Sequence, residues 1–245
     1  ERLAFARIRS TAERTRHPGQ KALVRCRDLT MPKIKVLPDD IANRIAAGEV
    51  VERPASVVKE LLENSLDAGA TRISVDVQEG GRKLIRVTDD GEGMSPDDAL
   101  ACFGRHATSK LYQPEDLFSI KTLGFRGEAL PSIASVSRLL LETQAAGWSG
   151  TAIEIAAGTL VSRQEHAFPQ GTQITVEDLF FNVPARRKFL RSESYELSQI
   201  TTYCTHYALA FPEIHFLLKS AGFEILSAPA ASGFRERIFQ VFGKD

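Results

Sequence analysis

The stretch SVVKELLENSLDAG, residues 56–69, decides how the rest of the chain is interpreted. Its apolar residues recur at helical spacing and form a single stripe. Glu60, Asn64 and Asp67 follow one another at i, i+4 and i+7, so they stand together on a different side of the same helix. The sequence therefore predicts a helix with a buried apolar face and a second face of carboxylates and an amide.

This helix is expected to open at residues 54–56, with Ser56 as its N-cap, and to stop at Gly69. Beyond Gly69 the apolar period changes from helical to two. Apolar and polar residues alternate over 73–77, and after a glycine-containing turn a second apolar run covers 84–87. The pattern predicts a β-hairpin directly after the helix.

The remaining segments mix the two periods without a strict strand–helix–strand rhythm. Helices are expected at 41–50, 96–103, 128–135, 184–190, 195–210 and 234–242. Strands are expected at 138–143, 151–156, 172–178, 214–219 and 223–226. This mixture favours an α+β fold, a two-layer α/β sandwich, over a doubly wound parallel sheet.

The composition is that of a globular protein, with 245 residues, 43% apolar and 25% charged, and 31 basic against 31 acidic side chains. No apolar stretch is long enough to span a bilayer, so no membrane partner is expected. Residues 1–30 are rich in Arg and the remainder has an acidic excess, which argues against a protein that coats duplex DNA. Three cysteines, Cys26, Cys102 and Cys204, form no paired motif, which suits free thiols in a reducing compartment. Cys102 and His106 share a helical face, but two ligands are too few for a structural zinc.

The polar face of the first helix has two interpretations. In one, the amide oxygen of Asn64 binds Mg²⁺, and Glu60, one turn earlier, takes a proton from an attacking water. A carboxamide coordinates the metal without adding negative charge beside a phosphate chain. In the other, the face is simply solvated.

The string DDGEG at 89–93 directly follows the second strand of the hairpin. As a site, the Asp89 carboxylate accepts a hydrogen bond from an exocyclic amino group, which selects adenine over guanine. Gly91 and Gly93 then let the backbone approach a planar base closely. The alternative is an ordinary turn.

Two polar segments, 105–110 and 124–130, bracket a loop rich in small and polar residues. The first contains basic and hydroxyl side chains, and the second runs from the glycines at 124 and 127 into a helix. Both features suit phosphate binding. The GxxxxGK[ST] spacing of a Walker A loop is absent from the chain, so a P-loop fold is not expected.

The order of these motifs resembles the four-motif signature of the GHKL ATPases, which include type II topoisomerases, heat-shock ninety chaperones, sensor histidine kinases and MutL mismatch-repair proteins. Five strings, which lie within 34–192, are similar to the MutL-type pattern. They are IAAGEVVERP at 45–54, ENSLDAGA at 63–70, RHATSK at 105–110, GFRGEAL at 124–130 and PARRKFL at 184–190. The resemblance implies the GHKL, or Bergerat, fold, a mixed and mainly antiparallel sheet with helices on one face.

The resemblance also implies a role for each matching residue. Glu60 would be the general base, Asn64 the Mg²⁺ ligand and Asp89 the residue that reads adenine. The residues implied to line the base pocket are Gly91, Gly93, Met94 and Thr172. Those implied to belong to a lid over the phosphates are Lys110, Gly124, Arg126, Gly127, Glu128, Ala129 and Leu130.

By the same resemblance, the chain is expected to be a Mg²⁺-dependent ATPase domain of a MutL-type mismatch-repair protein, with ATP and Mg²⁺ as cofactors. Bound ATP would drive N-terminal dimerisation, in which segment 41–50 packs toward the other subunit's nucleotide. It would also couple the protein to DNA and to mismatch-recognition and other repair proteins. A bacterial protein of this kind would be cytoplasmic and associated with the nucleoid.

Two alternatives stay open. The chain can be a nucleotide-binding module that does not hydrolyse ATP without a second domain. It can also be another GHKL member such as a sensor kinase, but a kinase needs an upstream phosphoacceptor histidine in a helix. His17, the histidine that precedes the ATP motifs, lies in an irregular segment.

Three regions are expected along the chain. They are a leader or upstream extension at 1–30, the GHKL ATPase domain at 31–230, and the start of a truncated transducer-type domain at 231–245, after a linker at 227–233. In this family the second domain carries a Lys that reaches the γ-phosphate, and that Lys would lie beyond residue 245. Its absence puts hydrolysis by this stretch of chain in doubt.

Two further positions are noted. Asp90 stands where the family often has Asn, and little effect is expected from the change. The basic cluster at 186–191 is interpreted either as a DNA contact or as a solvated helix face.

Overall fold

The computed structural model describes residues 47–48, 50–104, 107–110, 122–124 and 126–243. The leader at 1–30, most of the helix expected at 41–50, and His106 lie outside the described residues. The elements are α2 (Pro54–Asp67), β1 (Arg72–Gln78), η1 (Glu79–Gly81), β2 (Leu84–Asp89), α3 (Pro96–Ala101), α4 (Ala129–Ser135), β3 (Arg138–Gln144), β4 (Thr151–Ala156), β5 (Thr159–Glu165), β6 (Gly171–Glu177), α5 (Pro184–Phe189), α6 (Glu193–Ala210), β7 (His215–Ser220), β8 (Phe223–Ala228) and α7 (Phe234–Phe242).

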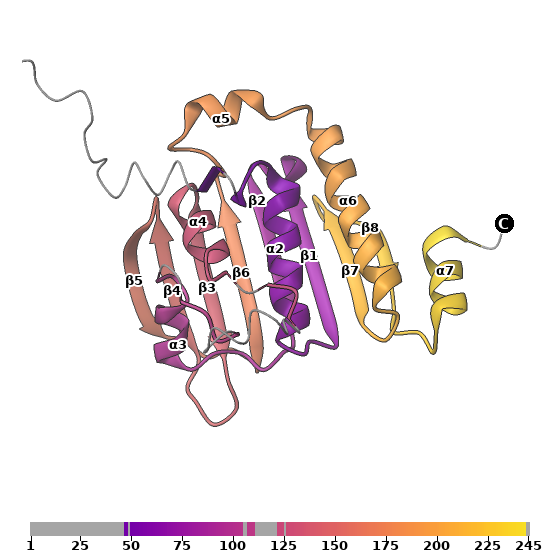
Figure 1. Ribbon diagram of the computed structural model, residues 1–245, viewed down its shortest axis with the longest axis horizontal. Coiled ribbons are helices and arrows are strands. Elements are labelled where there is room, and N and C mark those ends of the chain that lie inside the picture. The colour runs from indigo at the N-terminus through magenta and orange to yellow at the C-terminus, as the bar shows by residue number, and fades with distance from the viewer. Residues whose placement is uncertain (1–46, 49, 105–106, 111–121, 125, 244–245) are drawn as a thin grey trace, which may run out of the picture. The chain divides into compact units, whose positions relative to one another are not determined.

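The strands form one eight-stranded sheet in the order β5-β4-β3-β6-β2-β1-β7-β8. Neighbouring strands are antiparallel throughout, except for β1 and β7, which run parallel. Figure 1 shows α2, α4 and α6 lying over the same face of this sheet. The predicted mixed, mainly antiparallel sheet with helices on one face is confirmed.

Helix α2 packs on the centre of the sheet through its apolar stripe. Val57, Val58 and Leu62 are fully buried, and they face the inward residues of β1 and β2. Burying each such side chain contributes about 1.5–3 kcal/mol before the cost of chain entropy. The stripe therefore determines the rotation of α2 about its axis, and with it the direction of the polar face.

The start of α2 differs from the prediction. Pro54 occupies the first turn, where its missing N–H needs no partner, and Arg53 is the extended N-cap residue. Ser56 is within the first turn instead, and its amide donates to the Arg53 carbonyl at 3.0 Å. The prediction of Ser56 as N-cap is wrong. The predicted stop is confirmed, since Gly69 follows the helix with φ +69°.

The predicted hairpin is confirmed as β1 and β2, with Val75 opposite Val87. Strand β2 pairs on its other side with β6, a strand that lies more than eighty residues further along the chain, and there Asp89 is opposite Thr172. The sheet thus places the end of β2 beside the start of β6, although the two strands are far apart in the sequence.

Most other predicted elements are observed with ends shifted by one or two residues, but one strand was missed. Strand β5 (Thr159–Glu165) forms the edge of the sheet, and nearly all of its side chains are exposed. A strand that buries neither face has no alternation of apolar and polar residues, so the period of two that identifies other strands is absent.

The expected linker at 227–233 is shorter than predicted. Strand β8 runs to Ala228, which is fully buried. Beyond it, α7 is held by Arg237, whose guanidinium is fully buried and donates to the carbonyls of Ala228, Pro212 and Ile214 at 2.8, 2.7 and 2.6 Å. The division at residue 231 stays a prediction.

Arg237→Met is expected to destabilise the protein by about 2–4 kcal/mol, because it removes three hydrogen bonds that a buried guanidinium donates to backbone carbonyls. Urea denaturation of the variant and the parent chain measures this difference. Arg235→Met is the matched control, since Arg235 is exposed and touches only the Phe239 ring, 5.9 Å from its guanidinium carbon. An equal loss in both variants would show that Arg237 is not a specific anchor.

Candidate functional site

The carboxylate of Asp89 lies at the end of β2, where each of its oxygens accepts a hydrogen bond. Its Oδ2 accepts a hydrogen bond from Ser65 Oγ of α2 at 2.8 Å, and its Oδ1 accepts one from the Gly91 amide at 3.0 Å. Ser65 is buried, since it is on the face of α2 that meets the sheet. The two donors fix the orientation of the carboxylate and leave lone pairs for a further donor.

Burial raises the pKa of the Asp89 carboxyl above its ordinary value, while hydrogen bonds from Ser65, Gly91 and Thr172 act in the opposite direction. The net direction is upward because desolvation is the largest effect. A partly buried acceptor of this kind is suited to an amino group that replaces the lost water.

Three glycines allow the backbone around Asp89 to pack at distances that exclude a side chain. A Cβ on Gly93 would collide with the Gln144 carbonyl, and one on Gly171 with the carbonyl of Asp89 itself. A Cβ on Gly91 would lie 2.8 Å from the Ala68 carbonyl oxygen. Gly91 and Gly93 therefore have a structural reason to be glycine, in addition to any role in binding.

Thr143 on β3 connects the residues predicted to surround the base. Its hydroxyl lies 3.0 Å from the Thr172 hydroxyl, accepts from the Met94 amide at 3.0 Å and donates to the Gly171 carbonyl at 2.9 Å. Thr143 is fully buried. Sequence reasoning missed it because its neighbours come from β6 and from the loop after β2, and no local motif marks it.

A second cluster forms at the C-terminal end of α2. Lys110 Nζ lies 2.6 Å from Asp67 Oδ2 and 3.1 Å from Asn64 Oδ1. The Gly124 amide donates to Asp67 Oδ2 at 3.0 Å. Three predicted site residues, Asn64, Lys110 and Gly124, are thus brought together. Lys110 contacts Asn64 directly, and Asp67 joins Lys110 to Gly124.

The other described residues of the predicted lid, 126–130, follow Gly124 in the sequence. Two of them pack against other parts of the chain. Gly127, with φ +63°, approaches the backbone of Ala107, and a Cβ on it would lie 2.5 Å from the Ala107 carbonyl oxygen. Ala129 begins α4 after Glu128, Leu130 packs against the core, and Arg126 is exposed.

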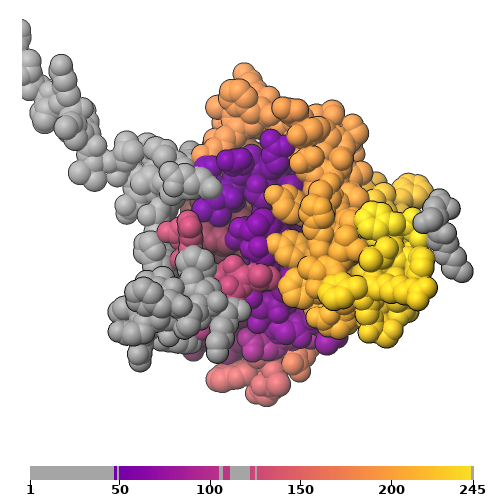
Figure 2. Space-filling view, turned by 45° about the vertical axis from the view of Figure 1, so that its right-hand side comes forward, coloured from indigo at the N-terminus to yellow at the C-terminus, as the bar shows by residue number. Residues whose placement is uncertain are grey.

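Glu60 has a different set of neighbours. Lys59 Nζ lies 3.4 Å from Glu60 Oε1 and 2.8 Å from Glu63 Oε2, and Tyr207 of α6 donates to Glu63 at 2.6 Å. Although burial alone would lower it, the two carboxylates raise the pKa of Lys59. Figure 2 shows part of α2, in indigo, reaching the surface beside α6, in orange. The Glu60 side chain is half-buried, with 26% of it exposed, and is paired with the ammonium of Lys59.

The Asn64 amide oxygen at the end of α2 is suited to a magnesium ion. The Lys110 ammonium lies 3.1 Å from this oxygen, and Lys110 is itself paired with the Asp67 carboxylate. Mg²⁺ prefers such hard oxygen ligands. The described residues contain no group of three or more His, Cys, Asp or Glu side chains that could hold a metal, and Cys102, whose pKa burial raises to about 12, is an unreactive thiol.

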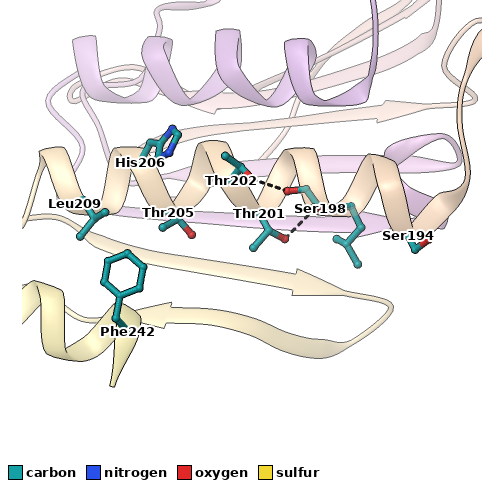
Figure 3. A pocket seen from close by; sticks show the side chains of 9 residues that line it. Ser194, Ser198, Thr201, Thr202, Thr205, His206, Leu209 and Phe242 are labelled. Carbon is teal, nitrogen blue, oxygen red and sulfur yellow. Dashed lines mark hydrogen bonds between the residues drawn. The ribbon is translucent and has the colours of Figure 1, made fainter. Parts of the chain in front are cut away.

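The described part of the chain also has an open groove of about 560 Å³ between α6 and α7. Figure 3 shows hydroxyl side chains of α6, among them Thr201 and Thr205, on one side and Phe242 of α7 on the other. The groove shares no residue with the two clusters, and His206 is the only ionisable side chain among its lining residues.

None of the described helices is both long enough and apolar enough to cross a membrane.

Asp90, next to Asp89, stabilises the backbone at the start of β1. Its Oδ1 accepts from the amides of Thr71 and Arg72 at 2.8 and 2.7 Å, and its Oδ2 from the Thr71 hydroxyl at 2.7 Å. Although partial burial opposes it, these donors lower the pKa of Asp90. The side chain ties the end of β2 to the start of β1.

The chain is similar to proteins of known family. The family model described as histidine kinase-, DNA gyrase B-, and HSP90-like ATPase matches residues 52–180, just over half of the chain. The DNA mismatch repair protein MutL of Koribacter versatilis (strain Ellin345) is 62% identical over 216 residues, which is 88% of this chain and 33% of that protein. The chain spans about a third of the length of the curated relatives it matches.

Solved structures show the same similarity. The Aquifex aeolicus MutL ATPase domain complexed with ADP is 37% identical, with a TM-score of 0.64 over 80% of this chain and 71% of that one. The N-terminal domain of a DNA repair protein is 29% identical, with a TM-score of 0.70 over 82% of this chain and 60% of that one.

Asp90→Asn is expected to change the free energy of unfolding by less than about 0.5 kcal/mol, because an amide can keep all three hydrogen bonds, whereas Asp90→Ala costs about 1–2 kcal/mol. A lowered pKa means that the ionised carboxylate adds stability at neutral pH, and this part is lost as the pH falls through the folded-state pKa, below 3.8. Denaturation at neutral and acid pH measures both effects. The parent chain should lose more stability in acid than Asp90→Asn, and an equal loss would contradict the role given to the charge.

Proposed function

The chain belongs to the MutL family of DNA mismatch repair proteins, within the GHKL ATPases, and from that premise we propose that it is a switch domain that binds Mg²⁺–ATP and hydrolyses it slowly. The adenine would lie at Asp89 and the phosphates near Lys110 and Gly124. Nucleotide state would control dimerisation of the N-terminal region and its engagement with repair partners.

One observation carries this proposal most directly. Consecutive residues of α2 serve the two clusters, since Ser65 holds Asp89 at 2.8 Å and Asn64 contacts Lys110 at 3.1 Å. Adjacent residues of α2 thus contact a carboxylate suited to an exocyclic amine and an ammonium group suited to phosphate. An adenine nucleotide has an exocyclic amino group at one end and phosphates at the other, so it matches both parts of the site.

Each group then has a distinct task. The Asp89 carboxylate accepts a hydrogen bond from the adenine amino group, with Thr172 and Met94 kept in place through Thr143. The Lys110 ammonium balances phosphate charge. Glu60 is the proposed base that accepts a proton from the attacking water. A magnesium ion bound at Asn64 would neutralise phosphate charge and favour attack on the γ-phosphate.

The activity of the whole protein extends this proposal. DNA, mismatch-recognition proteins and other repair proteins are proposed partners, because the relatives are named for mismatch repair. A cytoplasmic, nucleoid-associated location follows from the same relationship to bacterial proteins. The division into an ATPase domain at 31–230 and the start of a second domain at 231–245 is part of this proposal.

A second candidate differs only in turnover. The chain can bind Mg²⁺–ATP and fail to hydrolyse it, if hydrolysis needs a Lys from a further domain. Sensor-kinase activity is less well supported, since the relatives of highest identity reported above are mismatch repair proteins.

Asp89→Asn and Asn64→Ala are each expected to weaken binding of a non-hydrolysable ATP analogue with Mg²⁺ by roughly 10- to 100-fold, as a charge-assisted contact is worth about 1.5–3 kcal/mol. Isothermal titration calorimetry on the 245-residue chain measures the affinity. Asp97→Asn is the matched control, because Asp97 is exposed and pairs with Arg163 on the surface. Unchanged affinity in Asp89→Asn would reject the assignment of the adenine site.

Glu60→Gln is expected to retain nucleotide affinity and to lower the rate of phosphate release by roughly 10²- to 10⁴-fold, because only the proton acceptor is removed. The rate at saturating ATP, compared with that of the parent chain, measures this loss. A parent chain that binds ATP without releasing phosphate would favour the second candidate, the binding module. A variant as active as its parent would exclude Glu60 as the base.

A further inference from the structure

The carboxylate of Asp67 contacts two separate stretches of the chain. Oδ2 accepts from Lys110 Nζ at 2.6 Å and from the Gly124 amide at 3.0 Å, and Oδ1 accepts from the Leu123 amide at 2.9 Å. Only 8% of the Asp67 side chain is exposed, so water screens these contacts weakly. Asp67 therefore holds residues before and after position 111–121 against the last turn of α2.

Lys110 has a second contact that bears on metal binding. Its ammonium lies 3.1 Å from Asn64 Oδ1, the oxygen assigned above to Mg²⁺. Two cations cannot share that oxygen at such a distance without strong repulsion. Lys110 is thus an internal cation at the proposed metal ligand, and a metal ion at Asn64 would have to displace it.

We propose that Asp67 is the positioning residue of the phosphate end of the site. It holds Lys110, which also contacts Asn64, and it would keep Lys110 and Gly124 in place when a metal ion takes the Asn64 oxygen. This inference rests on the proposed function, and it adds to it a residue and a sequence of contacts. Asp67 acts through Lys110 and does not itself touch the nucleotide.

The surroundings of the ammonium allow this exchange. A Cβ on Gly124 would lie 3.3 Å from Lys110 Nζ, so any larger residue at position 124 would crowd the ammonium. The bond to Asp67, at 2.6 Å, is the shorter of the two contacts of Lys110 and joins opposite charges. A metal ion at Asn64 would therefore displace Lys110 from Asn64 alone, and Lys110, still paired with Asp67, would be free to face the phosphates.

The test compares Asp67→Asn, Lys110→Met and the double variant in the 245-residue chain. Two ligands are titrated, a non-hydrolysable ATP analogue with Mg²⁺ by calorimetry, and adenosine by NMR. Adenosine carries the base without phosphates, so it reports on the Asp89 end alone. Lys83→Met, at an exposed position before β2, and Asp97→Asn are the matched controls.

Each single variant is expected to bind the ATP analogue about tenfold more weakly, and the double variant no more weakly than the weaker single variant, because both changes remove one interaction. Adenosine affinity should stay unchanged in all three. In the ligand-free chain, the amides of Leu123 and Gly124 should exchange with solvent faster in Asp67→Asn than in the parent, whereas Lys110→Met should leave them close to the parent.

Two results would overturn the inference. If the losses in Asp67→Asn and Lys110→Met multiply in the double variant, the residues act independently. If Asp67→Asn weakens adenosine as much as the ATP analogue, its effect is a general one on the fold. A parent chain that binds neither ligand would refute the proposed function instead, and amide exchange would still decide whether Asp67 holds the two stretches.

Discussion

The burial of the apolar face of α2 against β1 and β2 is the constraint on which the site depends. A helix that buries Val57, Val58 and Leu62 has no freedom to rotate, so its other side chains point in determined directions. Ser65 is turned toward the sheet and reaches Asp89, while Asn64 is turned toward Lys110. Hydrophobic packing, which carries no chemical specificity, thereby orients the polar groups that do.

The sheet adds a second constraint through its order of strands. Because β6 lies between β2 and β3, Thr172 is beside Asp89 on one side and beside Thr143 on the other. The close approaches at Gly93 and Gly171 belong to the same arrangement, since backbone from neighbouring segments fills the space of a side chain. The base end of the site is thus a product of strand pairing, and the phosphate end a product of contacts around α2.

The elements that the sequence predicted well are those with a covered apolar face. The hairpin of β1 and β2 and helix α2 were identified because a buried face imposes a regular period on the residues. The exposed edge strand β5 escaped for the opposite reason, and Ser56 was mistaken for a cap because Pro54 can begin a helix two residues earlier. The apolar–polar period of a sequence indicates which side chains are buried. It therefore identifies a helix or strand only where one face of that element is buried.

The sequence by itself determined the α+β class, the family resemblance and the identity of the candidate residues Glu60, Asn64 and Asp89, since these depend on local spacing and on motif order. Only the tertiary structure decided which of them meet. It brought Lys110 against both Asn64 and Asp67, and it revealed Thr143 as the centre of a hydrogen-bond network, although no motif marks it. The physical reason is that hydrogen bonds between distant segments depend on strand order and helix rotation, which the packing of the whole core determines.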